Sequence, residues 1–171
     1  MDWIKLVDGN FRDIKNLAER AMDQLTIEEL NYAPNEESNS ISILVRHMSG
    51  YLKSRFKDFL TTDGEKPDRN RDAEFEGTYT TKDELLKCWN SGWEVLFATL
   101  DDLDEGDLEK TVYIRSEPHK VMEAIMRQVV HHSSHAGQIV YIGKLIKSNQ
   151  WKTLSIPRRQ SEQFNKGMMD K

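Results

Sequence analysis

The chain is nearly free of cysteine, with Cys88 alone among 171 residues. A single cysteine excludes an internal disulfide, so the fold cannot depend on cross-links as small secreted domains do. No apolar run approaches the roughly 20 residues needed to cross a bilayer, which argues against a membrane partner. Residues 1–5 lack the basic stretch followed by an apolar one that begins a secretory signal. These absences predict a cytoplasmic protein with no membrane partner.

Basic residues are outnumbered, with 24 lysines and arginines against 29 aspartates and glutamates and a net charge of −5. Because a phosphate backbone repels such a chain, we expect no nucleic-acid partner. Hydrophobic residues make up 37% of the sequence and charged residues 31%, a composition typical of a globular protein with large solvated faces. We predict a single domain over residues 1–171, with a tail at 150–171 that packs on it or extends from it.

Apolar residues recur at steps of three and four in four segments, which predicts four amphipathic helices. The expected ranges are 3–25, 41–60, 81–100 and 119–148. Thr81 and Glu84 have the spacing of a capping box at the start of the third helix. Thr26 and Glu29 have the same spacing and indicate a short extra turn after the first helix.

The connection between the second and third helices, residues 61–80, is long and has no apolar stripe. Fully extended, it exceeds the ~30 Å length of a bundle helix, so it can return to the end where the second helix began. The second and third helices would then be parallel. The predicted fold is all-α: a four-helix bundle, up-down-down-up, with a long crossover between helices two and three. The sequence leaves open whether the crossover shapes a pocket or only spans the bundle.

Two short segments and one glycine modify this bundle. Residues 111–115 are expected to form a short extended piece, and Glu117-Pro118 fits the start of the fourth helix because proline suits a first turn. Gly137 lies inside the fourth predicted helix, where glycine costs about 1 kcal/mol relative to alanine. Its expected use is the close approach of another backbone or of a partner subunit.

Three of the five histidines lie close together in the fourth predicted helix: His131, His132 and His135. Residues four apart point the same way, so His131 and His135 can hold one ion between them. By angle alone, a pair of His132 and His135 fits equally well. His47 lies on the flank of the second helix's apolar stripe, and our hypothesis is that it meets the pair around a divalent metal. His119 points away from this side and is expected to be structural or solvated.

Three histidines match the protein ligands of many catalytic zinc sites, which leave one position for water or substrate. Neutral imidazole binds zinc, nickel and iron, so the sequence does not choose among these ions. With no carboxylate among the ligands, the charge of the ion favours an incoming anion such as hydroxide or thiolate. The zincin motif His-Glu-x-x-His and the Glu-x-x-His pairs of di-iron bundles are absent from the sequence. The alternative is an interaction bundle without metal, in which the histidines only pack.

The pattern His-x-x-x-His-Ala-Gly-Gln-Ile at 131–139, together with Leu-Val-Arg-His-Met at 44–48, resembles the DinB superfamily. That superfamily includes the YfiT-like metal-dependent enzymes and the bacillithiol transferases. The segment Trp-Lys-Thr-Leu-Ser-Ile-Pro-Arg at 151–158 resembles an uncharacterised branch of it. The resemblance covers nearly the whole chain and implies a four-helix bundle whose second and third helices are parallel.

The resemblance also implies that His47, His131 and His135 hold the metal, which would settle the choice between His131 and His132. It implies a divalent zinc, nickel or iron ion, a small-molecule substrate and a homodimer. The reaction it suggests joins a low-molecular-weight thiol to a small electrophile. The alternatives are a metal-dependent hydrolase and a non-catalytic metal-binding stress-response protein. No catalytic residue beyond the metal ligands is assigned.

Overall fold

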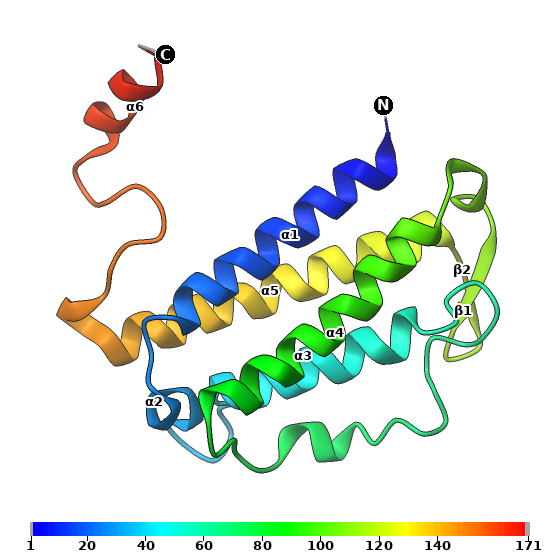
Figure 1. Cartoon of the computed structure of the whole chain (residues 1–171), viewed down its shortest axis with the longest axis horizontal. Helices are drawn as coiled ribbons and strands as arrows, with labels where there is room; N and C mark the ends of the chain where they lie inside the picture. Colours follow the sequence, from blue (N-terminus) through cyan, green and yellow to red (C-terminus); the bar gives the residue numbers. More distant parts are fainter. Residues whose placement is uncertain (1, 170–171) are drawn as a thin grey trace.

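The computed structural model describes residues 2–169 and is a bundle of four long helices with one small hairpin (Figure 1). The bundle helices are α1 (Trp3–Met22), α3 (Ile41–Phe56), α4 (Lys82–Asp102) and α5 (Val121–Lys147). Helices α3 and α4 run in one direction along the bundle, and α1 and α5 run in the other (Figure 1). The predicted all-α, up-down-down-up bundle with parallel second and third helices is confirmed.

Side-chain caps set where two of the helices begin. The short helix α2 (Ile27–Asn31) starts with a complete capping box made by Thr26 and Glu29. Helix α4 starts with the same arrangement, made by Thr81 and Glu84. In each box a side chain satisfies a backbone N–H that the first turn leaves without an intrahelical partner. Both capping boxes confirm the starts predicted from the sequence.

The second bundle helix is shorter than predicted, because α3 ends at Phe56 and not at residue 60. Asp58 has a φ of 49°, a left-handed conformation that a right-handed helix cannot contain. Phe59 is nevertheless buried. The apolar stripe therefore continues past the helix end, which is why periodicity alone extended the helix by one turn.

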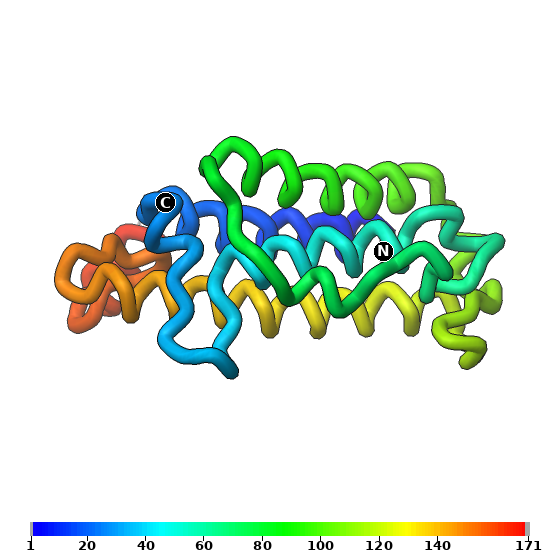
Figure 2. The backbone as a smooth tube through the Cα atoms, turned by 90° about the horizontal axis from the view of Figure 1, so that it is seen from below, coloured from blue at the N-terminus to red at the C-terminus, as the bar shows by residue number. Residues whose placement is uncertain are grey.

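The crossover, residues 57–81, returns along the bundle on the side of α3 (Figures 1 and 2). It contains the 3-10 turn η1 (Asp72–Phe75), which lies against α3. Two further 3-10 turns are η2 (Glu105–Asp107), after α4, and η3 (Ser148–Gln150), after α5. The crossover therefore covers part of the bundle, and does more than connect its two ends.

The core is built from the inward stripes of all four helices, with Phe11, Trp89 and Trp93 among its largest fully buried side chains. Helices α3 and α4 approach closely at Gly92. A Cβ atom at that position would lie 2.6 Å from the Cα atom of Ser49, so only glycine fits there. Helix α3, which carries His47, is thus packed backbone to backbone on α4.

A β-hairpin joins α4 to α5. Strands β1 (Thr111–Ile114) and β2 (Glu117–Lys120) pair antiparallel around a two-residue turn at 115–116. The extended piece predicted at 111–115 is confirmed, but the predicted helix start at Glu117-Pro118 is wrong. Pro118 lies in a strand of a two-stranded sheet, where a missing N–H is tolerated at an edge, and α5 begins only at Val121.

The tail follows the bundle for a short distance and then leaves it. Trp151 packs on Gly143 of α5, and Gln24 and Lys152 join the tail to the end of α1 by hydrogen bonds of 3.0 and 2.8 Å. Beyond them, α6 (Ser161–Met169) has no buried residue and projects away from the bundle (Figure 1). Among residues 2–169, no helix has the length and apolar character needed to cross a membrane.

Candidate metal centre

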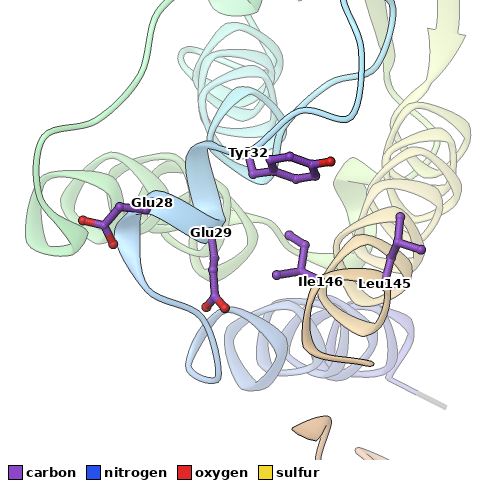
Figure 3. A pocket seen from close by; sticks show the side chains of 5 residues that line it. All are labelled: Glu28, Glu29, Tyr32, Leu145 and Ile146. Atoms are coloured by element: carbon purple, nitrogen blue, oxygen red, sulfur yellow. The ribbon is translucent and has the colours of Figure 1, made fainter. Parts of the chain in front are cut away.

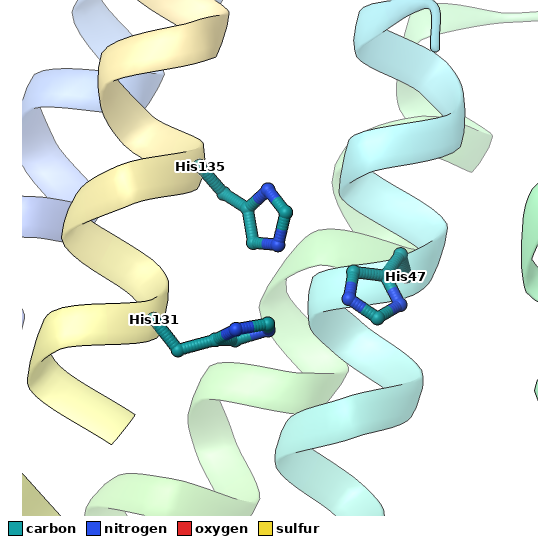
Figure 4. A group of neighbouring side chains, drawn as sticks. All are labelled: His47, His131 and His135. Carbon is teal, nitrogen blue, oxygen red and sulfur yellow. The ribbon is translucent and has the colours of Figure 1, made fainter. Parts of the chain in front are cut away.

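Three histidines from two helices converge in the middle of the bundle: His47 from α3, and His131 and His135 from α5 (Figure 4). One ring nitrogen from each lies within 4.8 Å of the others. The ring centroids of His131 and His135 are 4.5 Å apart, and that of His47 is 5.4 and 5.1 Å from them. In proteins, zinc lies about 2.0–2.1 Å from each ligating nitrogen, so small side-chain adjustments suffice for this set to hold an ion.

The structure separates His131 from His132, which helical angles did not. His132 is fully buried, and its Nδ1 lies 2.8 Å from the backbone oxygen of Gln128. Its ring packs edge-on against the rings of Phe11 and Trp93 in the core. His131 lies one residue earlier and faces His47 instead. The pair beside His47 is therefore 131 and 135, whereas the role of these residues as metal ligands stays a prediction.

The two histidines of the cluster that lie on α5, His131 and His135, are held in the neutral form. Burial, with a smaller contribution from the neighbouring histidines, lowers the pKa of His131 to about 3. Burial also lowers the pKa of His135 below its usual 6.5. A neutral imidazole keeps a lone pair on one ring nitrogen, which is the form that coordinates a metal. At neutral pH both rings are therefore available as ligands.

Hydrogen bonds leave suitable nitrogens free for an ion. The Nδ1 of His47 lies 2.9 Å from Oε2 of Glu74, and the Nδ1 of His135 lies 3.0 Å from Oε1 of Gln138. Both rings thus keep Nε2 for another partner. The Nε2 of His131 is buried and has no hydrogen-bond partner among the described residues. Buried polar atoms are normally satisfied, so an unpartnered nitrogen facing two histidines fits a metal site.

The crossover supplies neighbours that the sequence did not reveal. Glu74, in η1, contacts His47, and Arg69 forms hydrogen bonds of 2.7 and 2.8 Å with the Glu74 carboxylate. The Phe75 ring lies 4.8 Å from that of His47, centroid to centroid, and Tyr51 of α3 stacks on His131 at 4.2 Å. No periodicity marks residues in an irregular segment. The only signal was the unusual length of the connection.

His119 takes no part in this cluster. It lies in β2 within the hairpin, and its Nε2 is 4.0 Å from a carboxylate oxygen of Glu117. The expectation that it stands apart from the metal ligands agrees with this position.

An open groove of about 520 Å³ lies on the side of Gln138. Gln138, which contacts His135, lines it. The other lining residues come from the segment before α3, from α3 and from α5: Pro34, Ser38, Asn39, Leu44, Ser134, Gly137, Tyr141, Ile142 and Leu145. A second groove, of about 470 Å³, is lined by Glu28, Glu29, Tyr32, Leu145 and Ile146 (Figure 3). No histidine lines either groove, but Gln138 of the first is hydrogen-bonded to His135. The first groove is therefore the one placed to receive a molecule next to the cluster.

Residues 1–160 match the family described as "Protein of unknown function (DUF1572)". The chain belongs to the DUF1572 family. The match spans the bundle and ends one residue before α6 begins.

This DUF1572 chain is similar to a solved structure described as "Crystal structure of the conserved protein of locus from Enterococcus faecalis". The TM-score is 0.70 at 16% sequence identity, over 85% of this chain and 98% of that one. A likeness at this identity concerns the fold alone. No curated protein matches the chain.

Proposed function

We propose that this DUF1572 protein is a divalent-metal-dependent enzyme of the DinB/YfiT-like type. His47, His131 and His135 would hold a zinc, nickel or iron ion. The observation that carries the proposal is the convergence of three ring nitrogens within 4.8 Å, from two helices separated by the crossover. The motif resemblance to the DinB superfamily, seen in the sequence at 44–48 and 131–139, supports the same assignment.

The charge around the cluster favours an anionic ligand. A bound divalent ion lowers the pKa of a coordinated water or thiol toward neutrality or below. The three imidazoles add no negative charge, and the carboxylate of Glu74 is paired with Arg69. The surroundings therefore leave the charge of the ion uncompensated, and a thiolate or hydroxide would be attracted to its open position. The groove at Gln138 would hold the rest of that molecule.

The reaction we propose is the transfer of a low-molecular-weight thiol to a small electrophile. The thiol proton leaves to solvent, the sulfur forms a bond to the electrophilic carbon, and the leaving group departs with its bonding electrons. The contribution of the chain is to bind and orient the sulfur beside the groove. The buried ring of Tyr51 and the half-buried ring of Phe75, packed on the histidines, would keep bulk water away from that position.

Metal content and thiol conjugation test this proposal together. Protein purified without a histidine tag should contain about one divalent ion per chain, as expected for a three-histidine site. Conjugation of glutathione or cysteine to a chlorinated aromatic electrophile should be faster with metal-loaded protein. His135→Ala should lower that rate at least about 10- to 100-fold, because it removes a ligand and not merely an outer contact.

His119→Ala is the matched control, because it removes a histidine that lies outside the cluster. Its rate should equal that of the unmodified protein. Equal rates for His135→Ala and the unmodified protein would reject the thiol-transfer proposal. Turnover of an ester or amide without added thiol would favour the hydrolase. An ion bound without any activity would favour the non-catalytic metal-binding protein.

We also propose that the protein forms a homodimer through the outer face of α5. Val130, Tyr141 and Leu145 lie on this face with 68%, 69% and 59% of their surface exposed. Outside its own helix, no described atom lies within 4 Å of a Cβ built on Gly137, so no part of this chain uses the room that the glycine leaves. Contiguous apolar surface of this kind on a soluble domain usually marks an interface.

The spacing of this face favours a second copy as its occupant. Val130, Ser134, Gly137 and Tyr141 are placed symmetrically about the point between His135 and Ala136. In an antiparallel pairing around a two-fold axis, Val130 would face the partner's Tyr141, and Ser134 would face the partner's Gly137. The large side chains of Val130 and Tyr141 would then pack on each other, and the small residues Ser134 and Gly137 would allow the two backbones to approach. Each residue pair would occur twice, as in any isologous interface. Ser134, Gly137 and Tyr141 also line the groove, so a dimer would form along it and supply a further wall.

A further inference from the structure

A carboxylate from the crossover contacts one of the three histidines. The Oε2 atom of Glu74 lies 2.9 Å from Nδ1 of His47, and both side chains are more than 90% buried. The two residues are 27 positions apart, on η1 and α3. An ionised carboxylate has no proton to donate and can act only as an acceptor, so the proton of this hydrogen bond must be on Nδ1 of His47. The lone pair of His47 is then on Nε2.

This hydrogen bond also fixes how the ring of His47 lies. The imidazole is held at Nδ1 by Glu74 and packed against the ring of Phe75 at 4.8 Å. Figure 4 shows the ring directed toward His131 and His135. Carboxylates that hold the far nitrogen of a metal-ligating histidine orient the ring and raise its basicity. Glu74 is placed to do both.

The carboxylate is itself held in place. Arg69 Nε lies 2.7 Å from Oε1 of Glu74, and Arg69 Nη2 lies 2.8 Å from Oε2. The side chain of Arg69 is only 4% exposed, and its Nη1 reaches Glu65 at 3.3 Å. Two parallel N–H···O bonds restrain the carboxylate more than a single bond would, because they define its plane. Arg69 therefore stops Glu74 from rotating away from His47.

A glycine on α3 makes room for this arrangement. A Cβ atom added to Gly50 would collide with Oε1 of Glu74 and would lie 3.3 Å from its Cγ. Glycine is unfavourable inside a helix relative to alanine. Gly50 lies where the Glu74 side chain crosses α3, and the absence of a side chain at Gly50 allows Glu74 to reach His47.

We propose that Glu74 is a positioning residue of the metal centre, which sets the tautomer and orientation of His47, and that Arg69 and Gly50 hold Glu74 in place. The inference rests on the proposed metal-binding function. If Glu74 has this role, the crossover is part of the metal centre, and its length is explained by the need to bring Glu74 to His47. Because the same contact joins ion, histidine and crossover, metal binding should also reduce the opening of residues 65–76, by the reciprocity of linked equilibria.

Zinc affinity tests this role without any assay of activity. Competition with a chromogenic chelator should show zinc binding about 10- to 100-fold weaker in Glu74→Ala than in the unmodified protein. Glu74→Gln keeps an acceptor for Nδ1 and should recover part of that loss. Glu76→Ala removes an equal charge from an exposed position two residues away and should bind zinc as the unmodified protein does. In cobalt-loaded protein, the visible absorption band should shift in Glu74→Ala and not in Glu76→Ala.

Gly50→Ala tests the geometry while leaving every polar group in place. The colliding atom is the far end of a flexible side chain, so the fold can adjust by moving the Glu74 carboxylate. Alanine also favours the helix, so the melting temperature should stay the same or rise while zinc affinity falls about 10-fold. Gly9→Ala in α1, where a Cβ meets nothing within 4 Å, is the matched control and should leave zinc affinity unchanged.

The outcomes distinguish this inference from the proposed function. If the unmodified protein binds zinc and both Glu74→Ala and Gly50→Ala bind it equally well, the positioning role is wrong and the metal-binding function stands. If the unmodified protein binds no zinc, nickel or iron, both are overturned. Should Glu74→Ala fail to fold, Gly50→Ala still decides. Hydrogen exchange at residues 65–76 that is unchanged by zinc would contradict the coupling to the crossover.

Discussion

Neighbouring histidines on α5 have different surroundings and therefore different roles. His132 lies in the core between the rings of Phe11 and Trp93, and burial lowers its pKa to about 4, so it is neutral at pH 7. His131 is rotated by about 100° around the helix and stacks on Tyr51 beside His47. One turn of helix thus presents one imidazole to the core and another to the cluster.

Replacing His132 should affect stability and not metal binding. His132→Ala empties a fully buried site, and we expect the free energy of unfolding to fall by about 2–4 kcal/mol, as for other large-to-small core substitutions. Zinc affinity should remain within about threefold of the unmodified value. Urea unfolding of the metal-free protein and zinc titration measure the two quantities. His131→Ala should instead lower zinc affinity strongly and change the free energy of unfolding less. A large loss of zinc affinity in His132→Ala but not in His131→Ala would contradict the assignment of His131 as the ligand.

At the scale of elements, the carboxylate of Asp63 helps to fasten the beginning of the crossover to the hairpin turn. Asp63 accepts hydrogen bonds from the backbone N–H groups of Glu65, Arg115 and Ser116, at 2.7, 2.8 and 2.7 Å. Arg115 and Ser116 have φ values of 54° and 64°, and such turns usually need Asn or Gly. The Asp63 carboxylate accepts from the backbone N–H groups of both residues, which explains how Arg115 and Ser116 are accommodated at these positive φ values.

These bonds predict a stability change in acid. Burial raises the pKa of Asp63, but the three backbone N–H groups outweigh it and hold the folded-state pKa below 3.8. Because the folded value lies below the unfolded one, this contribution is complete above about pH 4 and is lost as the pH falls through the folded-state pKa. Asp63→Asn should cost about 1–2 kcal/mol at pH 7, and the difference from the unmodified protein should shrink below about pH 4.

Urea unfolding at several pH values measures this difference. Asp68→Asn removes a charge from an exposed position of the same segment and should show no such dependence. A deficit in Asp63→Asn that is as large at pH 3 as at pH 7 would show that the ionised carboxylate does not stabilise the hairpin turn.

The helix starts that carry a capping box were predictable from the sequence, whereas the start of α5 was not and the irregular elements were predictable only in part. Thr81 and Glu84 act within one turn of each other, so their spacing is sufficient to place the start of α4. The turn at 115–116 depends on Asp63, about 50 residues earlier. No local pattern could therefore indicate that Pro118 lies in a strand and not at a helix start.

At the scale of the molecule, the bundle covers the inward side of α5 and leaves the opposite side exposed. The inward residues of α5 pack on α1 and α3, whereas Val130, Tyr141 and Leu145 lie on the uncovered side. Tyr141 and Leu145 of this face also line the 520 Å³ groove, and Gln138 of the groove contacts His135 of the cluster. Dimerisation through α5 would therefore bury the exposed apolar side chains and also change the surroundings of the histidine cluster.

Charge on the exposed side of α5 should keep the protein monomeric. Val130→Glu and Tyr141→Glu should convert a dimer to a monomer in analytical ultracentrifugation, because an unpaired carboxylate in an apolar interface is strongly unfavourable. Leu6→Glu, at a 52% exposed position of α1, is the matched control and should leave the dimer intact. A monomer in the unmodified protein at concentrations near 100 μM, well above the Kd of about 1 μM that corresponds to roughly 8 kcal/mol, would contradict the proposed interface.

The sequence by itself determined the four amphipathic helices, the capping boxes that begin α4 and the short helix α2, and the need for a long crossover. Each of these depends on residues within a few positions of one another, or on how far a chain can reach. Only the tertiary structure decided that His131 and not His132 faces His47, and that Glu74 and Arg69 reach the cluster. Those relations depend on the rotation at which separate helices meet and on the path of an irregular segment, and both are set by long-range packing of the whole core.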